Sequence, residues 1–232
     1  MRQVHAGLAQ HGFAVFAHAQ TAGKGQRNKQ WLAQPGRNIM MSVVIAPERV
    51  GGGTPAFIFS MAMAVAAHGL LKKTCPEFDE GFTPDVKIKW PNDLFIGDRK
   101  AGGILIENSL SGDTWKMAVA GFGININQID FGELNGKATA LTQHTGKTYE
   151  VITVAKALCI EIDGVLKKLE RAPQEIFETY QQQLYKRGEW VKLKQGSRVF
   201  EAQIKSVNAA GQLVTQHAVE ETFNVGSIEW LL

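Results

Sequence analysis

The chain has 232 residues, of which 44% are hydrophobic and 20% charged, and its formal net charge is +3. This composition predicts a globular protein with one sizeable core and room for a small second module. So mild a charge balance argues against a nucleic-acid binder, which should show a clustered basic face. The two cysteines, Cys75 and Cys159, are far apart, which argues against a disulfide framework and a zinc site. We expect a cytoplasmic protein that binds neither DNA nor a membrane, since no stretch approaches the length of a membrane span.

Most of the chain alternates between helical and strand-like patterns. Val86-Lys87-Ile88-Lys89-Trp90, for example, shows the strict apolar alternation of a strand. Pro55 suits the first position of a helix. In chain order we expect a helix over 2–11, a strand over 13–19, a polar loop over 20–38, a strand over 39–46, a helix from Pro55 to about 73, strands over 86–90, 94–96, 102–107 and 115–124, and helices over 150–170 and 174–187.

The pattern changes after Gly188 to short β-like runs joined by tight polar connections. This texture is typical of a small β-barrel. We therefore predict two domains, an α+β domain with a mixed β-sheet over 1–185 and a β module over 186–232. A module of that size would hardly be stable without docking onto the first domain. Its strands are expected over 190–194, 198–207, 212–219 and 222–231.

A glycine-rich basic loop is the first candidate for function, Ala22-Gly23-Lys24-Gly25-Gln26-Arg27-Asn28-Lys29-Gln30-Trp31. Glycines let the backbone approach a ligand closely and offer amide donors, and the basic side chains add positive charge. An anion-binding loop that a ligand orders is one interpretation, and a solvated surface loop is the other. The spacing fits neither a P-loop nor a dinucleotide-binding fingerprint.

Two further segments lie where predicted strands begin or end. Lys89-Trp90-Pro91-Asn92-Asp93 ends a strand in a turn that presents an amide beside a carboxylate, either to bind a ligand N–H or a metal-bridged phosphate, or merely to build the turn. Lys100 stands at the mouth of a strand whose next residues include Gly102 and Gly103. A ligand could lie on these glycines with its anionic end at the lysine; a hairpin turn with a solvated lysine is the alternative.

The fourth segment is Ala120-Gly121-Phe122-Gly123-Ile124-Asn125-Ile126-Asn127. Glycine inside a strand marks close approach by another backbone or a ligand. Asn125 and Asn127 alternate, so we expect both to project to the same side, where an adenine or ribose would suit them. A strand end with two turn-forming asparagines is the alternative.

In this order the four segments, together with Gly36-x-Asn38, closely resemble those of the biotin protein ligase family, in its short form without an N-terminal DNA-binding domain. The resemblance runs from about residue 13 to the C-terminus. It implies the class II synthetase-like fold of biotin and lipoate ligases, followed by a small SH3-like β-barrel. It also implies that ATP activates biotin as biotinyl-5′-AMP, and that biotin then passes to a lysine of the biotin carboxyl carrier protein of acetyl-CoA carboxylase.

The resemblance also implies roles for particular residues. Lys100 and Arg27 would be catalytic, with Lys100 bridging the biotin carboxylate and the α-phosphate of ATP. The implied biotin contacts are Gln20, Lys24, Gly25, Gln26, Lys100, Gly102 and Gly103. The implied nucleotide contacts are Arg27, Trp31, Lys89, Asn92, Asp93, Asn125 and Asn127. Mg²⁺ would be held through phosphate beside Asp93, and for Trp31 a place in the core is an equal alternative.

The sequence departs from the family pattern at two places. Lys24 stands where the family usually has arginine, which keeps the charge but loses the bidentate fork. The family's Ser/Thr-Thr-Asn stretch before the loop would fall ahead of residue 1. Two alternatives stay open: a lipoate protein ligase, which is similar in fold and chemistry, and a non-catalytic biotin- or nucleotide-binding relative that lacks this pocket segment. The oligomeric state also stays open, with a homodimer as one alternative, and no residue specifies a carrier-docking surface.

Overall fold

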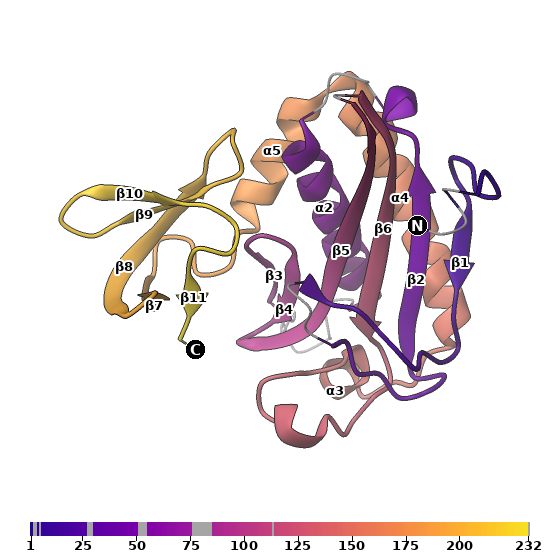
Figure 1. Ribbon diagram of the computed structural model, residues 1–232. Coiled ribbons are helices and arrows are strands. Elements are labelled where there is room, and N and C mark those ends of the chain that lie inside the picture. Colours follow the sequence, from indigo (N-terminus) through magenta and orange to yellow (C-terminus); the bar gives the residue numbers. More distant parts are fainter. Residues whose placement is uncertain are drawn as a thin grey trace.

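Two β-sheets, one of six strands and one of five, organise the chain (Figure 1). The structure, a computed structural model, describes residues 1, 4, 6–26, 30–50, 55–75, 85–112 and 114–231. The larger sheet has the order β1-β2-β6-β5-β4-β3 and the smaller one the order β10-β9-β8-β7-β11. The predicted α+β class and the β-rich C-terminal part are therefore confirmed.

The predicted elements between residues 38 and 182 are present, with shifted ends. The larger sheet comprises β1 (Ala14–Phe16), β2 (Asn38–Ile45), β3 (Val86–Lys89), β4 (Asp93–Ile96), β5 (Arg99–Ser111) and β6 (Thr114–Asn125). The helices are α2 (Ala56–Thr74), α3 (Leu141–Thr145), α4 (Val151–Arg171) and α5 (Pro173–Gln182), with 3-10 turns η2 (Pro47–Val50) and η3 (Gly132–Leu134). The helix expected over 2–11 is wrong in its second half, because Gly7 adopts a left-handed φ of 69° in a turn. Residues 2, 3 and 5 of that prediction lie outside the described residues.

Every strand pairing described in the larger sheet is antiparallel, so the expectation of a mixed sheet was wrong. The reason lies in the connections. The chain turns back directly between β3 and β4 and again at Gly97 between β4 and β5, and strands joined by tight turns must run in opposite directions. The helical connection from β2 to β3 joins strands that are not neighbours, so it creates no parallel pair.

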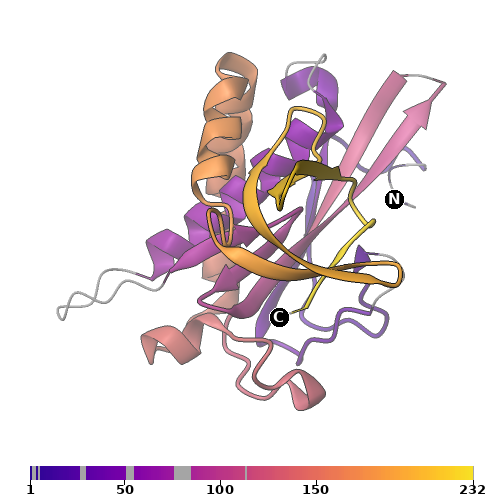
Figure 2. The ribbon, with the colours of Figure 1, turned by 90° about the vertical axis from the view of Figure 1, so that its left-hand side faces the viewer.

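The core lies between one face of this sheet and the helices, which stand together on that side in Figure 2. α2 packs against β3, β4 and β5, and α4 and α5 pack against α2. Among its fully buried side chains are Phe59, Met61 and Leu71, and burying one such side chain stabilises a fold by about 1.5–3 kcal/mol. By length and composition alone α2 could cross a membrane, contrary to our expectation, but 61% of that apolar stretch is buried inside the molecule, as in a core helix.

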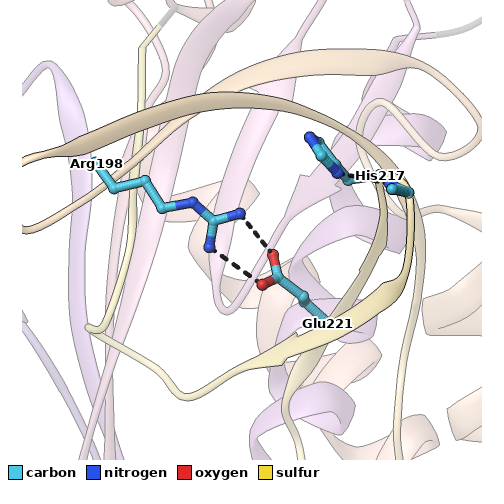
Figure 3. A network of polar contacts seen from close by, with 4 residues as sticks. Arg198, His217 and Glu221 are labelled. Atoms are coloured by element: carbon cyan, nitrogen blue, oxygen red, sulfur yellow. Dashed lines mark hydrogen bonds and ion pairs between the residues drawn. The ribbon is translucent and has the colours of Figure 1, made fainter.

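The smaller sheet consists of β7 (Trp190–Gln195), β8 (Arg198–Val207), β9 (Leu213–Gln216), β10 (Glu220–Phe223) and β11 (Glu229–Trp230). Arg198 on β8 donates two hydrogen bonds, 3.1 and 3.3 Å long, to the carboxylate of Glu221 on β10, beyond the intervening strand β9 (Figure 3). His217, also in Figure 3, accepts the N–H of Ala218 at 2.6 Å in the turn between β9 and β10. The domain boundary between residues 185 and 186 stays a prediction.

Candidate active site

Glycines on the face of the larger sheet that carries no helices leave a strip of bare backbone. Gly103 on β5 pairs with Gly123 on β6, and both are half-buried although their strands are central. A Cβ atom on Gly123 would lie 2.5 Å from Cε2 of Trp31, so the indole rests directly on the backbone there. Any side chain at Gly123 would displace Trp31. Gly102 points the other way, into the core beside Leu94, so the structure does not bring it to this face.

Lys100 stands at the end of this glycine strip. Its Nζ lies 2.6 Å from Oδ1 of Asp93 and 6.0 Å from the ring centroid of Trp31. A Cβ atom on Gly103 would lie 3.1 Å from the same carboxylate oxygen and 3.4 Å from Nζ. The side chains of Lys100 and Asp93 are 36% and 29% exposed, so a ligand can reach the ion pair. The structure thus brings together four of the predicted site residues from three separate segments.

A segment that the sequence reasoning missed holds the backbone of Lys100. The N–H of Lys100 donates to the carbonyl of Lys137 at 2.8 Å, and the N–H of Thr139 donates to the carbonyl of Lys100 at 2.9 Å. Because β6 ends at Asn125, residues 137–139 take its place beside β5. The role depends on backbone N–H and carbonyl groups, so neither the charge of Lys137 nor any motif in this stretch could have revealed it.

The glycine-rich loop begins and ends as a small hairpin beside the strip. The N–H of Trp31 donates to the carbonyl of Gly23 at 3.0 Å, and Lys24 forms a β-bridge with Gln30. Gln20 lies against the base of this hairpin, with Oε1 at 2.8 Å from where a Cβ of Gly23 would be. Lys24 is exposed, while Gly25 and Gln26 are half-buried. Arg27, the second predicted catalytic residue, lies outside the described residues.

The three predicted asparagines are all buried, and each is bonded to the fold. Asn92 donates its amide to the carbonyl of Ile104, and Asn125 donates to the carbonyl of Thr139 at 3.0 Å. The side chain of Asn127 donates to the carbonyl of Tyr149 at 2.7 Å and accepts the N–H of Tyr149 at 3.0 Å. The expected alternation of Asn125 and Asn127 along one strand was wrong, because β6 ends at Asn125.

Lys89 lies at the junction of the two sheets. Its Nζ is 5.3 Å from the ring centroid of Phe95 and 5.2 Å from that of Trp230, the second of which belongs to β11. Lys89 and Asp93 are also cross-strand partners, so their side chains leave the sheet on the same face. Lys89 therefore lies next to the aromatic side chains at the junction and next to Asp93.

The turn before Asp93 is braced from both sides. Nε1 of Trp90 donates to the carbonyl of Gly211 in the smaller sheet's β8–β9 connection at 3.0 Å, and the hydroxyl of Tyr180 donates to the carbonyl of Pro91 at 2.8 Å. Burial, with a further contribution from the charge of Asp93, raises the pKa of Tyr180, so the phenol stays a neutral donor. No pattern in the sequence identified Gly211 or Tyr180 as supports of the site.

The site offers a magnesium ion one carboxylate, that of Asp93, rather than a full set of protein ligands. No group of three or more His, Cys, Asp or Glu side chains gathers as a metal site within the described ranges. Mg²⁺ usually keeps several waters and binds through one or two carboxylates and substrate phosphates, and Asp93 fits that manner of binding.

Fold and site together define an α+β protein with a lysine–carboxylate pair and a bare backbone strip on the helix-free face of its sheet, suited to a small anionic ligand. Residues 3–125 match the sequence profile of the Biotin/lipoate A/B protein ligase family. The chain therefore belongs to that family.

Individual relatives agree with this membership. The chain is 36% identical over 158 residues to the bifunctional ligase/repressor BirA of Bacillus spizizenii, covering 66% of this chain and 46% of that protein. It is 33% identical over 135 residues to the biotin–acetyl-CoA-carboxylase ligase of Paracoccus denitrificans, covering 58% and 53%. The chain thus spans about half the length of these curated relatives.

The fold extends the likeness to nearly the whole chain. The biotin protein ligase of Aquifex aeolicus, solved in complex with biotin and ATP, superposes with a TM-score of 0.74 at 24% identity. The match covers 96% of this chain and 90% of that one, and so includes the C-terminal five-stranded sheet.

Proposed function

We propose that the protein is an ATP-dependent biotin protein ligase. The observation that carries this proposal is the placement of Lys100, whose ammonium group stands at the end of the Gly103–Gly123 strip beside Asp93 and Trp31. A flat backbone floor suits a thin ring system, and a cation at its end suits a carboxylate. The family membership and the relatives' names supply the substrate class.

In the first proposed step, the carboxylate of biotin attacks the α-phosphorus of ATP, which forms biotinyl-5′-AMP and releases pyrophosphate. Both reactants are anions. Two unit charges about 4 Å apart repel by about 4 kcal/mol at an effective dielectric near 20, enough to slow attack roughly a thousandfold. We propose that Lys100 lies between them and removes this repulsion, with Lys24 and Arg27 of the glycine-rich loop adding positive charge.

In the second proposed step, the ε-amine of a carrier lysine attacks the mixed anhydride, and AMP leaves. Neither step needs a nucleophile from the protein, so positioning and charge supply the catalysis. The adenylate is sensitive to water, so the glycine-rich loop should close over it, with Gln20, Gly25 and Gln26 on the biotin side. The acceptor we propose is a biotin carboxyl carrier protein.

We assign the nucleotide to the side of Trp31, Lys89, Asp93 and Asn125. The indole N–H of Trp31 supports this side, because it is buried and has no hydrogen-bond partner in the described part of the chain. An unsatisfied buried donor costs about 1–3 kcal/mol, which a ligand acceptor would recover. Both the donor and the acceptor of the Asn127 amide bond to Tyr149, which favours a supporting role for Asn127, whereas Asn92 and Asn125 each donate one side-chain hydrogen bond to the fold and stay candidates for direct contact. Mg²⁺ beside Asp93 would neutralise phosphate charge when bound.

We propose a cytoplasmic location as well. The two cysteines, Cys75 and Cys159, are free thiols, which fits a reducing compartment.

Single-turnover transfer of labelled biotin tests the proposed function. The chain is mixed with ATP, Mg²⁺ and labelled biotin, and a carrier domain with its acceptor lysine is added; lipoate replaces biotin in a parallel reaction. We expect pyrophosphate release that requires biotin and label that appears on the acceptor lysine. Faster transfer of lipoate would make the chain a lipoate ligase, and binding of biotin without pyrophosphate release would make it a non-catalytic relative; either result overturns the proposal.

A further inference from the structure

We infer that Thr139 is a positioning residue for Lys100, and that Gln143 and His144 hold its hydroxyl group in place. The inference rests on the proposed function, because Lys100 is the group through which Thr139 would act. Thr139 is fully buried, and it belongs to the segment 137–139 that continues the sheet beyond the end of β6.

The main chain of Thr139 is bonded on both sides to the site. Its N–H donates to the carbonyl of Lys100 at 2.9 Å, and its carbonyl accepts the side-chain amide of Asn125 at 3.0 Å. Two residues earlier, the carbonyl of Lys137 accepts the N–H of Lys100 at 2.8 Å. The backbone of Lys100 can therefore shift only if segment 137–139 shifts with it.

The hydroxyl of Thr139 ties this segment to α3, and the direction of each hydrogen bond follows from its partners. Oε1 of Gln143 accepts the N–H of Ala140 at 3.2 Å, so the carbonyl end of that amide faces Thr139. The hydroxyl must then donate to Oε1, which lies 2.9 Å away. Its oxygen stays available to accept from Nε2 of His144 at 2.8 Å, so the ring carries its proton on Nε2.

The same Oε1 of Gln143 also caps α3, because it accepts the N–H of the N-cap residue Ala140. α3 has only five residues, and its N-cap, Ala140, lacks a side chain that could cap it. The Thr139 hydroxyl is thus a fixed connection between a short helix and the backbone of the proposed catalytic lysine. Misplacing a reacting group by about 1 Å can slow a reaction on the order of a hundredfold, so a loosened segment should be visible in the rate.

The first test removes the hydroxyl without changing the shape of the side chain. We expect Thr139→Val to slow biotin- and ATP-dependent pyrophosphate release about ten- to a hundredfold, and Thr139→Ser to restore it to within about threefold of wild type. Thr145→Val is the matched control, because Thr145 is also buried but its hydroxyl donates to the carbonyl of Leu141 and accepts the N–H of Lys147, instead of bonding to Gln143 and His144. It should leave the rate unchanged. A Thr139→Val rate equal to wild type would overturn the inference.

The second test separates positioning from general destabilisation. In a Lys100→Ala background, assayed as single-turnover adenylate formation, adding Thr139→Val should slow the reaction less than about twofold, because the two changes remove the same contribution. If Thr139→Val slowed the Lys100→Ala protein by the same factor as it slows the protein that keeps Lys100, Thr139 would act independently of Lys100, which would contradict the inference. If Thr139→Val does not fold, His144→Ala removes one of the two hydrogen bonds of the Thr139 hydroxyl, the one to a half-buried ring, and is tested in both backgrounds against the same outcomes. A wild-type chain that releases no pyrophosphate would instead refute the proposed function itself.

Discussion

The ammonium group of Lys100 and the carboxylate of Asp93 meet at 2.6 Å although they come from different strands, β5 and β4, on either side of the turn at Gly97. A β-irregularity between Leu94 and Phe95 shifts the register by one residue here, so that Asp93 is opposite Gly103 rather than Gly102. The lysine therefore turns back over a glycine to reach its partner. Two motifs that are separate in the sequence become one charged pair.

Asp93→Asn should slow adenylate formation far more than it destabilises the fold. The pair is partly exposed, and such ion pairs contribute at most about 1 kcal/mol to stability. Without the carboxylate, however, Nζ of Lys100 loses its orientation, and we expect pyrophosphate release to fall on the order of a hundredfold. Urea unfolding and pyrophosphate assays on the same preparation check both parts. A loss of stability that accounts for the whole loss of activity would contradict this.

Gly123→Ala should weaken ATP binding by moving Trp31. The new Cβ would lie 2.5 Å from the indole and would push it away from the nucleotide. Because an aromatic contact between the indole and the base of ATP is worth about 0.5–1.5 kcal/mol, the KM for ATP should rise by up to about tenfold. Gly121→Ala is the control, because its Cβ would meet nothing nearer than the carbonyl oxygen of Leu105 at 3.5 Å, an ordinary contact. Equal effects of the two substitutions on the KM for ATP would refute the contribution of Trp31 to ATP binding.

Gly211→Ala should destabilise the molecule at the junction of its two sheets. Gly211 has a φ of 83°, and a Cβ there would lie 2.3 Å from the ring of Phe57 on α2. The left-handed backbone costs about 1–2 kcal/mol and the overlap about 1–3 kcal/mol more. Gly196→Ala is the control and should have only the backbone cost, since Gly196 has a φ of 57° but open space around the position of a Cβ. Equal free energies of unfolding for the two variants would show that the Phe57 contact is unimportant.

Acid should destabilise the protein through His68 on α2. Burial lowers the pKa of His68 from 6.5 to about 4, against the opposing effect of its hydrogen bond to the carbonyl of Val86. Between these values the unfolded chain binds the proton and the folded chain does not. Above pH 6.5 His68 therefore has no effect on the free energy of unfolding. As the pH drops from 6.5 towards 4, the free energy of unfolding falls by about 3 kcal/mol in all. His68→Gln keeps a donor for Val86 but cannot titrate, so its free energy of unfolding should depend less on pH. Identical pH dependence would exclude His68 as the cause.

The sequence predicted the elements better than their arrangement. Alternation in residues 86–90 and the apolar texture of α2 report local burial, so both elements were found. Strand direction depends on which strands become neighbours, which no local pattern records, and the sheet was wrongly expected to be mixed. Likewise, the end of β6 at Asn125 follows from the arrival of segment 137–139, about a dozen positions later in the chain, rather than from the alternation that includes Asn127.

For the candidate site, motifs identified the residues with unusual chemistry but not their supports. Lys100, Asp93 and Trp31 stood out because charge, turn and glycine signals surround them, and the structure places them together. Thr139 and Gly211 did not stand out, because each reaches the site residues through a backbone N–H or carbonyl offered from a distant segment. Every residue has such groups, so only the fold can show which of them matter.

The most direct test of the account is adenylate formation by Lys100→Ala. If Lys100 separates two anions, its removal should slow biotin- and ATP-dependent pyrophosphate release on the order of a thousandfold. The free energy of unfolding should change little, because the side chain is 36% exposed. Pyrophosphate release at the wild-type rate in a folded Lys100→Ala protein would contradict the central claim.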